Sequence, residues 1–130
     1  MIFVDTSAWF ARFVPDDPDH LSTIELFAKN KSPLITTDYC VDETLTLLQI
    51  RNRPKLAEAA GQLLFDESLA KLHFLTRHQI ERAWILFQQH ISNGWSFTDC
   101  TRKILIDEFH IKTAISLDKH FLQFGVTIVH

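Results

Sequence analysis

The chain has 130 residues, of which 46% are hydrophobic and only 3 are Gly and 4 are Pro, so it is long enough to bury a real core in one domain, residues 1–130. No apolar run approaches a membrane span, and the N-terminus lacks the pattern of a secretion signal, so we expect a cytoplasmic protein with no membrane contact. The formal charge of −3 argues against a protein that holds nucleic acid mainly by broad electrostatic attraction.

The first third of the chain predicts a strand, two helices and a second strand. Residues 2–4 are apolar throughout, and residues 7–13 follow with helical spacing of aromatic side chains. The Pro-rich loop 15–18 separates them from a second helix that begins near residue 19 and ends before Pro33. Residues 34–36 then read as a short strand.

The middle of the chain continues the alternation. Apolar side chains recur on adjoining turns over residues 38–51, and Pro54 suits the first turn of a further helix. Residues 71–75 predict a third strand, and residues 77–91 predict a long helix that ends near an Asn-Gly pair.

The last third adds a helix from Ser96 or Thr98 to about residue 109, then strands at 113–117 and 126–129 separated by a short helix. Helices thus separate nearly every strand. This alternation is typical of parallel strands with helical crossovers on both faces of the sheet. We therefore predict an α/β protein, a three-layer α/β/α sandwich with a mainly parallel central sheet.

Four carboxylates stand where an apolar segment meets a predicted helix start: Asp5, Glu43, Asp99 and Asp118. Ligand sites in open parallel sheets gather at the carboxyl ends of the strands, and three of these acids lie at or just after such ends. Glu43 would join them from the first turns of the helix after the second strand. The topology therefore predicts one acidic cluster.

Helix capping is the alternative explanation for each acid taken singly. Asp is a favoured N-cap, and residues 96–99 match the capping-box pattern with an acid at the third helical position. Asp5 and Asp118 fit capping equally well, whereas Glu43 lies too far inside its helix. Capping does not explain the joint pattern.

Crowded carboxylates repel one another, so a compensating cation is expected. Oxygen ligands suit Mg²⁺ or Mn²⁺, whereas zinc would draw on Cys and His residues, which show no ligand spacing here. Such ions can activate water and clamp a phosphodiester, which predicts hydrolysis of a nucleic-acid backbone. Thr6, Ser7 and Thr98 flank the acids and could support the ligands, with helix capping as the alternative.

The segments around the four acids together resemble the PIN-domain family, and VapC-type toxin ribonucleases within it. These segments read FVDTSA, VDETL, SFTDC and SLDKHF, and they follow in the family's order over essentially the whole chain. The resemblance implies a Mg²⁺- or Mn²⁺-dependent endoribonuclease in which Asp5, Glu43, Asp99 and Asp118 hold the metal. It also implies a homodimer, a small antitoxin partner and a structured RNA substrate. Some relatives carry a further acid where this chain has Ser116, which leaves the number of metal ions open.

Other side chains admit two interpretations. Basic residues near the acids are candidate RNA contacts or solvated charges: Arg51, Arg53, Lys55, Arg102, Lys103 and Lys119. Trp9 and Trp95 could stack on bases but fit a core better. His120 could touch substrate or pack beside its aromatic neighbour. Cys40 and Cys100 lie in no metal or redox spacing, which favours buried thiols.

Two other functions remain open from the residues alone. A phosphotransferase with Asp5 as nucleophile lacks the usual second acid two residues later, because position 7 is Ser. A non-catalytic PIN-like module that binds RNA or protein would keep the fold and use the acidic face for a basic partner. Retention of all four acids favours the nuclease.

Overall fold

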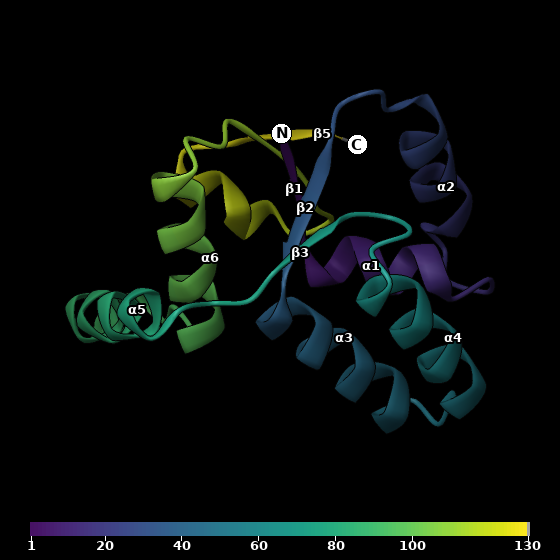
Figure 1. The fold of residues 1–130 in the computed structure, drawn as a ribbon, viewed down its shortest axis with the longest axis horizontal. Helices are drawn as coiled ribbons and strands as arrows, with labels where there is room; N and C mark the ends of the chain where they lie inside the picture. The colour runs from purple at the N-terminus through teal and green to yellow at the C-terminus, as the bar shows by residue number, and fades with distance from the viewer. Residues whose placement is uncertain (130) are drawn as a thin grey trace.

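The computed structural model describes residues 1–129, and five parallel strands form its central sheet in the order β3-β2-β1-β4-β5 (Figure 1). In the register, Phe3 of the middle strand faces Ile35 on one side and Ala114 on the other. His130, the last residue of the predicted domain, lies outside the described residues. The strands are β1 (Ile2–Val4), β2 (Leu34–Thr37), β3 (Lys71–His73), β4 (Thr113–Ile115) and β5 (Thr127–Val129).

Helices cover both faces of the sheet (Figure 1). They are α1 (Thr6–Phe13), α2 (His20–Lys29), α3 (Asp38–Ile50), α4 (Pro54–Phe65), α5 (Arg77–Gln89), α6 (Phe97–Glu108) and the 3₁₀ helices η1 (Ile91–Asn93) and η2 (Lys119–Phe124). Phe3 packs into a core with α5, α6 and η2, whereas the next residue, Val4, packs with α1, α3 and α4 on the other face. The predicted α/β/α sandwich is confirmed. No helix within residues 1–129 is long and apolar enough to cross a bilayer.

Two strands are shorter than predicted because side-chain oxygens take over their backbone N–H groups. The strand predicted at 113–117 ends at Ile115, where the Ser7 hydroxyl accepts a hydrogen bond from the N–H of Leu117. The strand predicted at 71–75 ends at His73, and the Asp38 carboxylate accepts from the N–H of Leu75. Such local bonds compete with a sheet ladder.

The direction of winding reverses beside β1. The chain runs from β1 outward through β2 to β3, then returns to the other side of β1 to form β4 and β5. The carboxyl end of β1 is therefore the point where crossovers leave in opposite directions, which is where ligands bind in open α/β sheets. Asp5 follows directly after this end of the strand.

Candidate acidic active site

Asp5 is a buried acid that does not cap its helix. It stands at the N-cap position of α1, but its side chain makes no capping hydrogen bond. Its Oδ2 instead accepts hydrogen bonds from the hydroxyls of Ser7, at 3.0 Å, and Ser116, at 3.1 Å. Burial raises the pKa of Asp5 above its ordinary value, and Arg102 and Ser7 only partly offset this. The capping interpretation of Asp5 is wrong.

Asp99 caps its helix and also faces the site. At the third position of α6 its Oδ2 accepts from the N–H of Ser96, while its own N–H donates to the Ser96 hydroxyl. The predicted capping box is thus confirmed. The second oxygen, Oδ1, remains for the cluster and lies 3.0 Å from Nη1 of Arg102. The cap holds Asp99 in place while this oxygen faces the other acids.

Glu43 reaches the same place from α3. This helix begins directly after β2, with the Thr37 hydroxyl accepting from the N–H of Cys40. Oε1 of Glu43 lies 2.7 Å from Nη2 of Arg102, and 43% of the side chain is exposed. Beside it lies a cavity of about 260 Å³ that Thr98 helps to line. Glu43 is therefore the most solvent-accessible of the three clustered acids.

Asp118 lies at the rim. It is exposed, and its Oδ1 accepts from the N–H of His120 at 2.9 Å, so it caps η2. The hydroxyl of Ser116 accepts from the N–H of Asp118 and donates to Asp5, which links the two acids through one side chain. The structure thus brings three predicted acids together and leaves the fourth at the edge of the cluster.

Arg102 lies at the centre of the cluster, and this placement was not predicted. Its side chain is only 6% exposed, and its three nitrogens each face a different carboxylate: Nε is 2.9 Å from Asp5, Nη1 is 3.0 Å from Asp99 and Nη2 is 2.7 Å from Glu43. Burial disfavours its charged form, but Cys40, Asp5 and Glu43 raise the pKa of the guanidinium above its ordinary value. The interpretation of Arg102 as a solvent-facing charge is wrong.

A sequence signal for Arg102 does exist. Residues three positions apart lie on the same face of a helix, so Arg102 had to share a face with Asp99 once α6 was recognised. It also stands in a run of buried positions, with Thr101 before it and Ile104 and Leu105 shortly after. A charged residue on a buried helix face needs charged partners.

The residues that flank the acids differ in what they contact. The Thr6 hydroxyl accepts from Nη2 of Arg102 at 3.1 Å, and Ser7 holds Asp5. The basic side chains differ too: Lys55 and Lys119 are exposed, whereas Arg53 pairs with Asp16. Lys103 is half-buried and pairs with Asp107, four residues further along α6. Arg51, Lys55 and Lys119 are therefore the exposed basic candidates, and their contact with RNA stays a prediction.

The Trp and Cys side chains that admitted two interpretations are buried in the core. Trp9 is fully buried, Trp95 is 8% exposed, and Cys40 and Cys100 are buried free thiols, so the core interpretations are confirmed. His120 is half-buried between Trp95 and Phe124, with its Nε2 3.5 Å from Asp99.

The donor set fits a divalent cation in chemistry and charge. Three carboxylates face a single guanidinium, which leaves an excess of negative charge. Asp5 Oδ1 is buried and, among the described residues, has no hydrogen-bond partner, because the Nε–H of Arg102 is not aimed at it. In this arrangement no three acidic, His or Cys side chains of residues 1–129 converge closely enough to hold a metal. Arg102 occupies the space between them.

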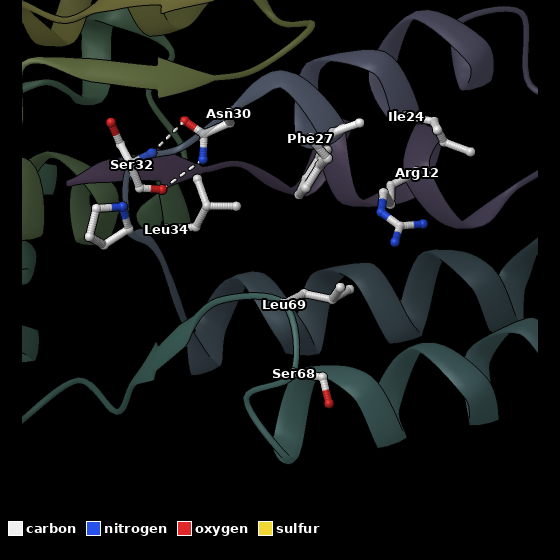
Figure 2. Close-up of a pocket in the computed structure, with 10 residues that line it drawn as sticks. Arg12, Ile24, Phe27, Asn30, Ser32, Leu34, Ser68 and Leu69 are labelled. Carbon is white, nitrogen blue, oxygen red and sulfur yellow. Dashed lines mark hydrogen bonds between the residues drawn. The ribbon is translucent and has the colours of Figure 1, made fainter.

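A larger hollow of about 600 Å³ lies elsewhere, between α2 and the segment before β3 (Figure 2). Apolar side chains such as Phe27 and Leu69 line it, and its Asn30 and Ser32 are hydrogen-bonded to each other in a local turn. It offers no convergent reactive groups, so the acidic cluster is the candidate site.

Comparison with known proteins agrees with this fold. The model of the PIN domain matches residues 2–123. The 23S rRNA-specific endonuclease VapC20 of Mycobacterium tuberculosis is 30% identical over 125 residues, covering 96% of this chain and 95% of the relative. A VapC ribonuclease of Archaeoglobus fulgidus is 27% identical over 124 residues, covering 91% and 77%.

The solved structures agree as well. The crystal structure of M. tuberculosis VapC20, described as a sarcin-ricin loop cleaving toxin, matches with a TM-score of 0.90 and 28% identity over 98% of this chain and 97% of that one. The chain therefore belongs to the PIN-domain family and is an endoribonuclease of the VapC toxin type. The phosphotransferase alternative is set aside by this membership.

Proposed function

We propose that this chain hydrolyses phosphodiester bonds of a structured RNA with the help of Mg²⁺ or Mn²⁺ bound at Asp5, Glu43, Asp99 and Asp118. The observation that carries the proposal is the meeting of Asp5, Glu43 and Asp99 around one point at the carboxyl end of β1. These acids come from three separate segments of the chain. Placing three like charges together costs free energy that a purely structural role does not require.

A bound metal would supply a low-pKa water and neutralise charge on the phosphate. The four acids would hold it. Ser7 and Ser116 fix one oxygen of Asp5 and leave the other for a ligand, and the capping box does the same for Asp99. Glu43 and Asp118 are the exposed members, placed where RNA and water have access.

The substrate and partners are proposed from the relatives. A 23S ribosomal RNA fragment that contains the sarcin-ricin loop is the first substrate to test, because VapC20 is described as acting there. We also propose a homodimer, a small antitoxin protein that covers the acidic groove, and a cytoplasmic setting. A short basic segment of such a partner would be enough to block one acidic cluster.

Cleavage of labelled RNAs tests the proposal. Purified protein is incubated with the sarcin-ricin fragment, a tRNA and an unstructured RNA, each in Mg²⁺, in Mn²⁺ and in EDTA. We expect cuts in the structured RNAs that require metal and disappear in Asp99→Asn, because that variant keeps the cap but removes a ligand charge. Absence of cutting by folded, antitoxin-free protein would favour the non-catalytic binding module.

Metal is also expected to stabilise the fold. If 10 mM Mn²⁺ is about ten times the dissociation constant, mass action adds about 1.4 kcal/mol and raises the Tm by about 3–6 °C. Differential scanning calorimetry with Mn²⁺, Mg²⁺ and EDTA measures this shift. Asp107→Asn, which changes an exposed acid on α6, should keep the shift. An equal Tm in EDTA and in 10 mM of either metal would contradict a metal site in the folded protein.

A further inference from the structure

Asp5 and Arg102 are the only buried charged residues among residues 1–129, and they face each other. The guanidinium engages all three of its nitrogens, adds the Thr6 hydroxyl as a further acceptor, and lies over the ring of Phe121 at 5.8 Å. A side chain with so many fixed contacts is held in one place. Arg102 thus provides the compensating cation that clustered acids need.

We propose that Arg102 is an internal cation that competes with the divalent metal for the acidic cluster, so that metal binds only when the guanidinium withdraws from Asp5 and Asp99. This inference rests on the proposed function, because it concerns the regulation of the same site. The guanidinium faces one oxygen of each of the three clustered acids. An oxygen with a guanidinium nitrogen 2.7–3.0 Å away has no room for a metal ion on that side.

A role for Arg102 in holding RNA phosphate fits the structure less well. Its side chain is 6% exposed, and each of its nitrogens already faces a carboxylate. A phosphate would have to enter among three like charges to reach it. The metal, in contrast, carries the charge that these acids attract.

The same contacts explain how the acidic cluster is ordered in the metal-free protein. With Arg102 in place the acids are neutralised in part and the cluster is ordered without any ion. Withdrawal of the guanidinium breaks its ion pairs with Asp5 and Asp99, so the metal must replace them. The apparent metal affinity is then the intrinsic affinity multiplied by the fraction of protein in which Arg102 has withdrawn. The wild-type chain is therefore expected to bind Mn²⁺ weakly.

The test compares the Mn²⁺ affinity of wild type and two variants by titration calorimetry on folded protein. Arg102→Met keeps a long unbranched side chain over Phe121 but removes the charge, and we expect it to bind Mn²⁺ about tenfold tighter or more. Arg82→Met is the matched control, because it removes a guanidinium paired with Glu108 near the opposite end of α6, and it should bind Mn²⁺ within about twofold of wild type. Arg102→Met should also melt below wild type in EDTA and gain more from Mn²⁺.

Equal or weaker Mn²⁺ binding by folded Arg102→Met would overturn the proposal. If that variant does not fold, Arg102→Lys decides, because a compact ammonium does not reproduce the planar fork with which the guanidinium holds the three carboxylates. Tighter Mn²⁺ binding than wild type then supports the proposal, and equal or weaker binding overturns it. Cleavage of the sarcin-ricin fragment, measured in parallel, separates the two ideas. If Arg102→Met binds Mn²⁺ no more tightly than wild type while wild type shows metal-dependent cutting, the competition proposal fails and the proposed nuclease function stands. If Arg102→Met binds Mn²⁺ more tightly but neither wild type nor any variant cuts RNA, the competition proposal stands and the proposed nuclease function fails.

Discussion

Asp5→Asn is expected to lower RNA cleavage by about a thousandfold, the equivalent of about 4 kcal/mol in the barrier, while the protein stays folded. The substitution removes the charge of the most buried acid in the cluster but keeps its shape. The Asn oxygen can face Arg102, and its NH₂ group can donate to the hydroxyls of Ser7 and Ser116, which now accept. Single-turnover cleavage at saturating Mn²⁺ measures the loss.

The fold of this variant is expected to survive for an electrostatic reason. Because burial raises the folded-state pKa of Asp5 above the unfolded value, stability falls as pH rises through the interval between the two, and this loss is complete above the folded-state pKa. Neutral Asn does not carry that penalty, and Arg102 retains Asp99 and Glu43 as partners. We expect a melting temperature in EDTA within a few degrees of wild type.

A matched control makes the result specific. Asp107→Asn removes an exposed carboxylate that pairs with Lys103 on the same helix as Asp99, and it should cleave like wild type. Full activity in Asp5→Asn, or an equal loss in Asp107→Asn, would contradict the assignment of the acidic cluster as the active site.

The sequence allowed the architecture and the meeting place of the acids to be predicted because both follow from topology. Alternating apolar strands and helices leave few arrangements, and the acids that follow strand ends must then share one edge of the sheet. Asp5 illustrates this, since its position after β1 was enough to place it at the switch point. Strand ends were predicted less well, because a single side chain such as Ser7 or Asp38 can take a backbone N–H from the ladder.

Arg102 shows that residue type alone does not predict where a side chain lies. A basic residue after an acidic motif suggests a phosphate contact, and only the packing of α6 against the sheet turns this residue inward. Asp118 shows the converse, because its carboxylate lies at the rim and caps η2 while sharing the neighbourhood of Asp5 through Ser116. Helix spacing from Asp99 limits the face that Arg102 can occupy, but whether that face meets a site or solvent depends on long-range contacts.

Trp9→Ala is expected to destabilise the fold by about 3–5 kcal/mol and to lower the Tm by about 10–20 °C. Trp9 is fully buried, its ring lies against Phe13 and Phe27, and its Nε1–H donates to the Thr36 hydroxyl at 3.0 Å. Truncation removes this ring from the core and leaves a cavity between α1, α2 and the sheet. Urea unfolding followed by circular dichroism measures the free energy of unfolding.

Two further variants divide that loss into packing and hydrogen bonding. Trp9→Phe keeps a ring but removes the donor to Thr36, and it should lose about 1–2 kcal/mol beyond the difference in ring size. Trp84→Ala is the control for loss of an indole, because Trp84 is 51% exposed and should lose less than about 1 kcal/mol. An equal loss for Trp84→Ala and Trp9→Ala would contradict the assignment of Trp9 to the core.

Trp9 is also connected to the acidic cluster by two consecutive hydrogen bonds. The hydroxyl of Thr36 accepts from Trp9 and donates to the carbonyl of Val4, the residue that precedes Asp5. This chain ties α1 and β2 to the end of β1, so it fixes the backbone from which Asp5 projects. We therefore expect Trp9→Phe to weaken cleavage below its melting temperature, whereas Trp84→Ala leaves cleavage unchanged, because only Trp9 is connected to the strand that carries the acid.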